Sequence, residues 1–244
     1  MSGNTMVTAL LGAVEAEISL AVSQLKGKET GGLEGRRHYR GLLNGKRTVI
    51  AEAGVGAVNA AITLMDLLAR HRLERVLMIG CAGVYPGVGL DVGDVAIASE
   101  ERYAEFGVET IDGWRPFEQP WMRLLPHTIT DQPAAFALDR ERAAAFERVA
   151  GGLGRAGAGK FITVNGVSGD LETARRRGFR FDALVENMEG AGAAHVCALY
   201  GVPFAEVRGI SNMAGVRDKN EWKFDEAVQK AQEVALRARQ EMIW

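Results

Sequence analysis

Three charged residues and one amide lie in segment 189–212, which is otherwise almost entirely apolar. Glu206 and Arg208 fall inside the apolar run 202–212, and Glu189 begins the small-residue segment that precedes it. Because side chains alternate along a strand, Glu206 and Arg208 would point to the same face. Ionised groups rarely occupy such strands unless they are paired or functional. This spacing predicts a cluster in which Arg208 binds a carboxylate, with Asn212 just past the strand, where a ligand would meet it.

Each of these residues also has a purely structural interpretation. Glu189 could complement the dipole at a helix start, Arg208 could belong to a structural ion pair, and Asn212 could be a turn residue. Glu15 and Glu17 pose the same question, because both fall in the first turns of a helix predicted after the first apolar run. Residue type and spacing alone leave both interpretations open.

The elements that must hold these side chains read as alternating strands and helices. Segment 185–212 has the pattern of strand, helix and strand, with Gly201 ending the helix. Asn44-Gly45 is typical of a tight hairpin turn. Further strands are expected at 38–43, 47–51, 75–79, 92–98 and 160–164, and further helices at 139–149 and 224–242. The expected fold is a single α/β domain over residues 1–244, with three α/β/α layers and a central twisted mixed sheet.

Two glycine-containing segments bear on ligand binding. Gly80 and Gly83 follow the apolar strand expected at 75–79 and interrupt it. Without side chains there, a ligand could lie directly on the backbone. The segment Gly54-x-Gly56 suggests a dinucleotide-binding loop, but Asn59 occupies the place of the third glycine, so we reject that interpretation. Residues 103–127 are rich in aromatic residues and proline, and we interpret them as a long lid, binding or interface loop.

The composition narrows the classes of partner. With 47% hydrophobic and 25% charged residues and a net charge of -2, the chain gives no electrostatic reason to bind nucleic acid or a membrane. The arginine run 175–177 is interpreted as a solvated face. Cys81, Cys197 and four scattered histidines lack metal-ligand spacing, so we expect no metal and no other cofactor. No stretch resembles a signal peptide or a membrane span, which predicts a cytoplasmic protein.

Several spaced motifs together resemble a known family. The segments Met188-Glu189-Gly190-Ala191, Val202-Pro203-Phe204 and Arg208-Gly209-Ile210-Ser211-Asn212 are similar to the signature of the nucleoside phosphorylase and hydrolase superfamily. The resemblance extends over nearly the whole chain. Within the superfamily, the chain resembles the 5'-methylthioadenosine/S-adenosylhomocysteine nucleosidases, and it resembles the futalosine hydrolases more strongly. The resemblance implies a nucleoside phosphorylase/hydrolase-like fold and a homodimer that acts on a small-molecule nucleoside.

The resemblance also implies a role for each matching residue. Glu17 would activate the hydrolytic water, and Asn212 would act on the departing base. Ribose contacts would come from Glu189, which Arg208 keeps ionised, and from an apolar surface at Met188. The remaining residues expected to bind substrate are Asn187 and the loop formed by Cys81, Ala82 and Gly83. In the family, serine often stands where this chain has Cys81, so a side-chain hydroxyl contact is lost there while backbone contacts stay.

Asn212 sets the expected base. Methylthioadenosine nucleosidases carry aspartate at this position, whose protonated form can give a proton to purine N7. An asparagine amide cannot give that proton, but its NH2 group can donate a hydrogen bond to N7 or to a 6-oxo oxygen. The resemblance therefore implies hydrolysis of futalosine to hypoxanthine and dehypoxanthinyl futalosine, a step of menaquinone biosynthesis by the futalosine pathway.

Three alternatives stay open. One is an adenine-directed methylthioadenosine nucleosidase, and another is a purine nucleoside phosphorylase, which is disfavoured because a glutamate facing the phosphate would repel it. The third is a nucleoside-binding protein without turnover.

For the carboxyphenyl tail of futalosine, a cation and an aromatic wall are expected from among Arg115, Arg217, Lys219 and Trp222.

Overall fold

A ten-stranded mixed sheet forms the centre of the computed structural model, which describes residues 6–111, 113–117, 122, 124, 125 and 134–244. Along the sheet the strand order is β11-β10-β6-β12-β5-β1-β4-β3-β2, and β9 pairs with β6. Its strands are β1 (Val7–Gly12), β2 (Lys26–Glu29), β3 (His38–Leu43), β4 (Lys46–Glu52), β5 (Leu73–Val84), β6 (Val95–Tyr103), β9 (Ala135–Ala137), β10 (Ala156–Thr163), β11 (Ala183–Asn187) and β12 (Phe204–Met213).

The sheet curls so that β11 pairs with two strands. It runs parallel to β10 and also pairs antiparallel with the end of β5, where Val185 lies opposite Val84 and Glu186 opposite Gly83. Strands β1 and β12 both run parallel to β5. The carboxyl ends of β1, β5, β11 and β12 are therefore gathered in one place.

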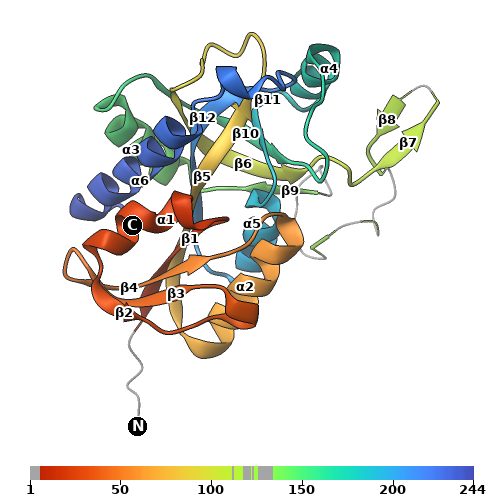
Figure 1. Cartoon of the computed structure of the whole chain (residues 1–244). Coiled ribbons are helices and arrows are strands. Elements are labelled where there is room, and N and C mark those ends of the chain that lie inside the picture. The colour runs from red at the N-terminus through yellow and green to blue at the C-terminus, as the bar shows by residue number, and fades with distance from the viewer. Residues whose placement is uncertain (1–5, 112, 118–121, 123, 126–133) are drawn as a thin grey trace.

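Helices cover both faces of the sheet (Figure 1). They are α1 (Glu15–Gln24), α2 (Ala57–Arg70), α3 (Arg140–Gly151), α4 (Leu171–Phe181), α5 (Gly190–Tyr200) and α6 (Phe224–Gln240). One large hydrophobic cluster joins the sheet to α1, α3 and α6, and a second joins the opposite face to α2 and α5. The three-layer α/β/α prediction is therefore confirmed. Among the described residues, no helix is both long enough and apolar enough to span a bilayer.

Adjacent residues of β1 pack into the two hydrophobic clusters on opposite faces of the sheet. Leu10 packs into the first cluster, whereas Ala9 and Leu11 pack into the second. Such strands are buried on both faces, which explains why they read as continuous apolar runs rather than as alternating patterns.

Local signals in the sequence are confirmed at the hairpin and at one helix start. Asn44 and Gly45 join β3 to β4 with φ values of 48° and 74°, the left-handed geometry that a two-residue type I′ turn requires. Asp139 caps α3 by accepting a hydrogen bond from the backbone N–H of Arg142 at 3.1 Å.

Two strand predictions were wrong in their limits, and one strand was not predicted. Strand β5 does not stop before Gly80 but continues to Val84, because β12 pairs with it along that whole length. Strand β6 begins at Val95 rather than Val92 and extends to Tyr103, between β10 and β9. The short exposed strand β2 was not predicted, since its four residues carry no apolar pattern.

The long loop predicted at 103–127 is only partly a loop. Strands β7 (Val108–Thr110) and β8 (Gly113–Arg115) form a separate two-stranded hairpin that projects from the rest of the molecule in Figure 1. Phe106 packs edge-on against Phe117 at its base, with ring centroids 5.0 Å apart. The remainder of this prediction, at 112, 118–121, 123, 126 and 127, lies outside the described residues.

Candidate active site

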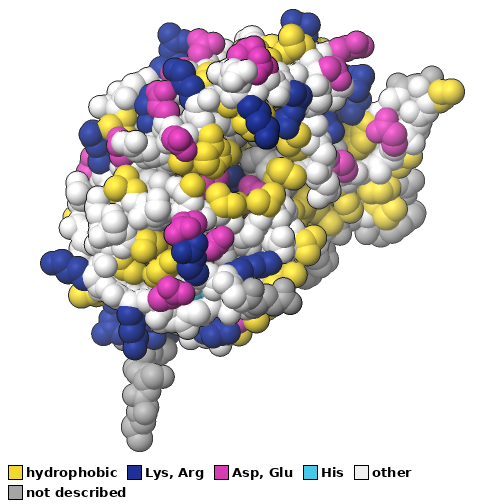
Figure 2. All heavy atoms as spheres, viewed as in Figure 1, with side chains coloured by type: hydrophobic (Ala, Val, Ile, Leu, Met, Phe, Trp, Pro, Cys, Tyr) yellow, Lys and Arg dark blue, Asp and Glu magenta, His cyan; other side chains and the backbone are white. Residues whose placement is uncertain are grey.

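A cavity of about 360 Å³ opens where the carboxyl ends of β1, β5, β11 and β12 meet. In Figure 2 this face of the molecule is hollowed near its centre, with acidic and basic side chains visible at the bottom and hydrophobic side chains around it. The cavity is lined by all nine predicted site residues, namely Glu17, Cys81, Ala82, Gly83, Asn187, Met188, Glu189, Arg208 and Asn212. The structure thus brings together residues that are up to 195 positions apart, since Glu17 and Asn212 share one cavity.

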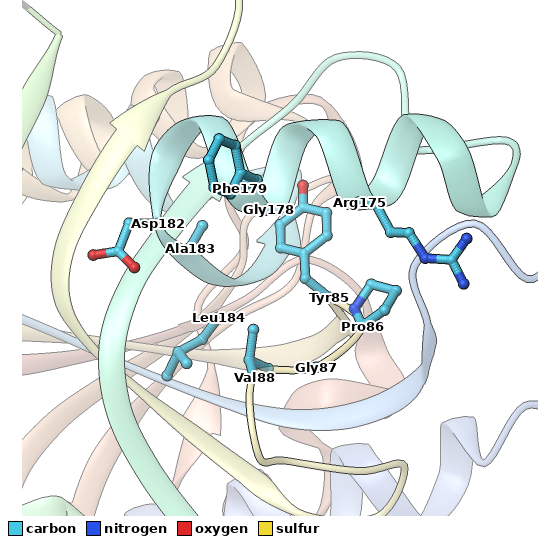
Figure 3. Close-up of a pocket in the computed structure, with 10 residues that line it drawn as sticks. All are labelled: Tyr85, Pro86, Gly87, Val88, Arg175, Gly178, Phe179, Asp182, Ala183 and Leu184. Atoms are coloured by element: carbon cyan, nitrogen blue, oxygen red, sulfur yellow. The ribbon is translucent and has the colours of Figure 1, made fainter.

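A larger groove of about 620 Å³ lies between residues 85–88 and α4 (Figure 3). Arg175 and Asp182 are the charged residues among its described lining residues. In Figure 3 they stand at opposite ends, and the Arg175 side chain extends away from the groove. Because no charged groups converge there, the smaller cavity is the better candidate for chemistry.

Glu17 is held rigidly at the wall of the cavity. It occupies the third position of α1, and its Oε2 accepts backbone N–H bonds from Ala13 at 2.6 Å and Val14 at 3.4 Å. Its Oε1 accepts the N–H of Cys81 at 2.9 Å, which ties α1 to β5. Burial raises the pKa of Glu17 above its ordinary value, although Arg208 and the N–H groups of Cys81 and Ala13 oppose the shift. A fixed carboxylate with a raised pKa is suited to accept a proton.

Glu15 takes no part in this arrangement. It lies two residues earlier on the same helix, is exposed, and forms an ion pair with Arg37. The helix dipole explains Glu15, but it does not explain why Glu17 turns inward to Cys81.

Arg208 sits at the centre of a buried cluster of carboxylates. Its Nε donates to Glu206 Oε1 at 2.8 Å and its Nη1 donates to Glu189 Oε2 at 3.2 Å. Only 1% of the Arg208 surface is exposed, so these pairs are shielded from water. Burial alone would lower the pKa of Arg208, but Glu206, Glu189 and Glu17 raise it above its ordinary value. The predicted pairing of Arg208 with a carboxylate is confirmed, and the structure shows that both Glu189 and Glu206 take part.

Gly80 makes room for this cluster rather than for a ligand. A Cβ atom built on Gly80 would lie 2.5 Å from Glu17 Oε1 and 2.6 Å from Arg208 Nη1. The space that a side chain would take is therefore filled by the chain's own charged groups, contrary to the expectation of an open backbone surface at this residue. At Gly83 the corresponding atom would lie 3.4 Å from Asn212 Nδ2.

Glu189 is positioned from two sides. Arg208 binds its Oε2, and the backbone N–H of Gly56 donates to its Oε1 at 3.0 Å. Gly56 has a φ of 99°, a conformation that favours glycine, and it is the N-cap residue directly before α2. The Gly54-x-Gly56 segment thus holds a carboxylate, and this contact was not predicted.

Asn187 lines the cavity, but its side-chain atoms bond within the fold. Its Oδ1 accepts the backbone N–H groups of Glu189 at 2.9 Å and Gly190 at 2.8 Å, directly before and at the start of α5. Its Nδ2 donates to Glu101 at 2.8 Å. The side chain expected to bind substrate is therefore engaged in orienting Glu189.

Asn212 lies within β12 and not beyond it, because a bulge after Ile210 extends the pairing with β5. Its Oδ1 accepts from Ser211 Oγ at 2.8 Å, and its Nδ2 donates to the Met213 carbonyl at 3.0 Å. One Nδ2 proton remains for a ligand.

Burial and Glu17 raise the pKa of the nearby Cys81 thiol to about 12, so that side chain is neutral.

The comparisons with known proteins agree with this geometry. A family model described as "Phosphorylase superfamily" matches residues 7–243. The chain belongs to this superfamily. Futalosine hydrolase of Thermus thermophilus is 38% identical to it over 191 residues, which are 78% of this chain and 80% of that protein. The 5'-methylthioadenosine/S-adenosylhomocysteine nucleosidase of Chromohalobacter salexigens is 32% identical over 226 residues, covering 91% and 90% of the two chains.

Solved structures show the same superfamily fold. The 5'-methylthioadenosine/S-adenosylhomocysteine nucleosidase of Colwellia psychrerythraea, crystallised with adenine, superposes with a TM-score of 0.80 at 26% identity, over 97% of this chain and 95% of that one. The family resemblance expected from the motifs is confirmed. The expectation of a purine nucleoside hydrolase agrees with the nucleosidases among these relatives.

Ser168, Gly169 and Asp170 lie between two elements, since β10 stops at Thr163 and α4 begins at Leu171. Ser168 donates to Glu186 Oε2 at 2.6 Å, and Asp170 caps α4 by accepting from Thr173. Of this region, only the preceding Val167 reaches the cavity.

The residues suggested for the 5' tail separate into two groups. Arg217 and Trp222 line the cavity, and the Arg217 guanidinium lies 4.9 Å from the Trp222 ring centroid. Lys219 lines a separate groove that also includes Trp222, and Arg115 belongs to β8 of the projecting hairpin. Within the described part of the chain, no three His, Cys, Asp or Glu side chains are grouped so as to hold a metal ion.

Proposed function

We propose that this member of the superfamily hydrolyses the N-glycosidic bond of futalosine, releasing hypoxanthine and dehypoxanthinyl futalosine for menaquinone biosynthesis. The observation that carries the proposal is the convergence of Glu17, Glu189 and Asn212 on one cavity. The 38% identity to a futalosine hydrolase supports the choice of substrate.

Each group has a role in the proposed reaction. Glu17 takes a proton from a water molecule, whose oxygen forms a bond to the anomeric carbon while the bond from that carbon to the purine breaks. Glu189 binds the ribose hydroxyls and stabilises the positive charge that develops on the sugar. The electron pair of the broken bond passes to the purine, where the Asn212 NH2 group stabilises it by a hydrogen bond.

Phosphorolysis fits the cavity less well. Arg208 is already bound to Glu206 and Glu189, so it has little positive charge to offer a phosphate ion. Glu17 would repel phosphate from the side where the nucleophile must approach. Hydrolysis needs no anion at that place.

A substrate panel tests the proposal directly. Futalosine, inosine and methylthioadenosine are each incubated with the purified protein, with and without phosphate, and the released base is quantified. We expect phosphate-independent release of hypoxanthine from futalosine at the highest kcat/KM. Strict phosphate dependence, or preference for methylthioadenosine, would reject the proposal in favour of a phosphorylase or an adenine-directed nucleosidase. Ligand binding without any turnover would indicate a binding protein.

Replacing Asn212 with aspartate should shift the preferred base. Aspartate can be protonated to donate to N7 and can accept from a 6-amino group, whereas it lacks the NH2 donor for a 6-oxo group. One such mismatch costs ~1–3 kcal/mol, so the ratio of kcat/KM for methylthioadenosine to that for futalosine should rise about 5- to 150-fold. A uniform loss with both substrates would contradict a role for Asn212 in base recognition.

Arg217 and Trp222 are proposed to receive the carboxyphenyl tail of futalosine. Substitution of Arg217 by glutamine should raise KM for futalosine about tenfold, because a charge-assisted hydrogen bond of ~1.5 kcal/mol is lost. Inosine has no such tail, so its KM should not change. Lys219→Gln removes an equal charge from the same segment outside the cavity and provides the control. Equal effects of the two variants on futalosine would disprove the assignment.

A single-domain organisation over residues 1–244, a cytoplasmic location and a homodimer are also part of the proposal. Light scattering coupled to gel filtration measures the oligomeric state, with about 53 kDa expected for two chains of 26.3 kDa. A mass of one chain would reject the dimer without affecting the proposed chemistry.

A further inference from the structure

A fourth carboxylate lies behind the cavity and is not used by the proposed reaction. Glu101 on β6 is fully buried, and its Oε1 accepts hydrogen bonds from the Thr163 hydroxyl and from Asn187 Nδ2. Its Oε2 has no hydrogen-bond partner among the described residues. An oxygen of this kind is costly if the carboxyl is ionised.

Glu206 is a second buried carboxyl group with one oxygen that has no hydrogen-bond partner among the described residues. It is also fully buried, and its Oε1 accepts from Arg208 Nε at 2.8 Å, while its Oε2 has no partner among the described residues. A Cβ atom built on Gly190 would lie 2.7 Å from Glu101 Oε1 and 2.7 Å from Glu206 Oε1. Both carboxyl groups therefore meet over the bare backbone of Gly190, at the start of α5.

The balance of charge around Arg208 is unfavourable if every carboxyl is ionised. Glu17, Glu189 and Glu206 already face this one guanidinium, and Glu101 adds a further carboxyl next to Glu206. Two neighbouring buried carboxyl groups cannot both ionise cheaply, so one of them holds a proton. Burial and the adjacent Glu206 raise the pKa of Glu101 well above its ordinary value.

Glu101 is the better place for that proton. Burial also raises the pKa of Glu206, but its contact with Arg208 opposes the shift. The nearby Tyr103 hydroxyl stays protonated, because burial and Glu101 raise its pKa to about 12. A protonated Glu101 is a donor, and Glu206 Oε2 is an acceptor that lacks one.

We propose that Glu101 and Glu206 share one proton at neutral pH and act as positioning residues for Glu189. The ionised Glu206 fixes Arg208 at its Nε, and this leaves Nη1 directed at Glu189 Oε2 and at the Cys81 carbonyl, each at 3.2 Å. Glu189 thereby keeps the orientation that the proposed function requires for binding ribose. The inference rests on that function only for its kinetic consequence.

Infrared spectroscopy tests the shared proton without any nucleoside. A protonated carboxyl group has a C=O stretching band that an ionised carboxylate lacks. Glu17 contributes no such band in the Glu17→Gln background, so the difference between E17Q and the double variant E17Q/E101Q at pH 7.5 isolates the pair. We expect one carboxylic acid band that disappears with Glu101→Gln. Absence of a band in this difference spectrum would overturn the proposal, whether or not futalosine is a substrate.

Kinetics test the positioning role. Glutamine is neutral and similar in shape to a protonated glutamate, so E101Q should keep kcat for futalosine within about threefold of the wild type. Leucine cannot bond to Glu206, Asn187 or Thr163, and E101L should lose at least tenfold in kcat. If glutamine were as harmful as leucine, an ionised Glu101 would be needed, and if E101L kept full kcat, no positioning would occur; either result contradicts the proposal. Should E101L fail to fold, E101Q and the infrared band decide.

Discussion

Replacing Glu17 with glutamine is expected to lower kcat for futalosine by about 10²–10⁴-fold, the usual contribution of a general base. The amide keeps the size of the side chain but has only one oxygen, so it can accept from either Cys81 or Ala13 and not from both, and it cannot take a proton from water. Substrate binding should therefore stay measurable while turnover is lost. Single-turnover assays and calorimetric titration with futalosine measure the two effects separately.

Glu15→Gln is the matched control for this substitution. It makes the same chemical change two residues away on α1, at an exposed position that is paired with Arg37. Its kcat should equal that of the wild type. Turnover that survives in E17Q, or that is lost equally in E15Q, would show that Glu17 is not the base.

The pH dependence provides a second measure of Glu17. A base must be ionised to act, and burial raises the pKa of Glu17 above that of an ordinary glutamate. The value of kcat/KM should therefore fall on acidification at a pH above the usual titration range of glutamate, about 4.3. A plateau that extends down through that range would contradict the raised pKa.

Replacing Arg208 with methionine is expected to destabilise the fold by about 3–5 kcal/mol, the usual result of breaking a buried ion pair from one side. Methionine fills much of the same space but leaves Glu206 and Glu189 without their cation at a buried position. Activity should fall as well, because Glu189 loses one of its two supports. Urea denaturation followed by circular dichroism gives the free energy of unfolding.

Arg37→Met is the corresponding control. Arg37 also pairs with two glutamates, Glu15 and Glu52, but it lies at the surface, where such pairs contribute about 0–1 kcal/mol. The free energy of unfolding should change little. Similar losses in the two variants would mean that the burial of Arg208 does not determine its contribution.

The sequence by itself determined a hairpin turn, a helix start and nine residues that line the cavity. Asn44-Gly45 specified a hairpin because few other residues accept two positive φ angles, and Asp139 specified a helix start because its side chain satisfies a free N–H group. The motifs around Glu189 and Arg208 identified the superfamily, and with Glu17 they predicted residues that do line one cavity. These signals depend on a residue and its near neighbours along the chain.

Only the tertiary structure decided which distant groups meet. The N–H of Gly56 reaches Glu189, and Glu101 reaches Glu206, because α2 packs beside α5 and β6 pairs with β12. Arg217 and Trp222 enter the cavity while Lys219, between them in sequence, faces another groove. Pairing between strands that are far apart in the chain sets such contacts, and no periodicity or spacing encodes which strands will be neighbours. A buried carboxyl with an unpartnered oxygen is therefore visible only after the sheet has formed.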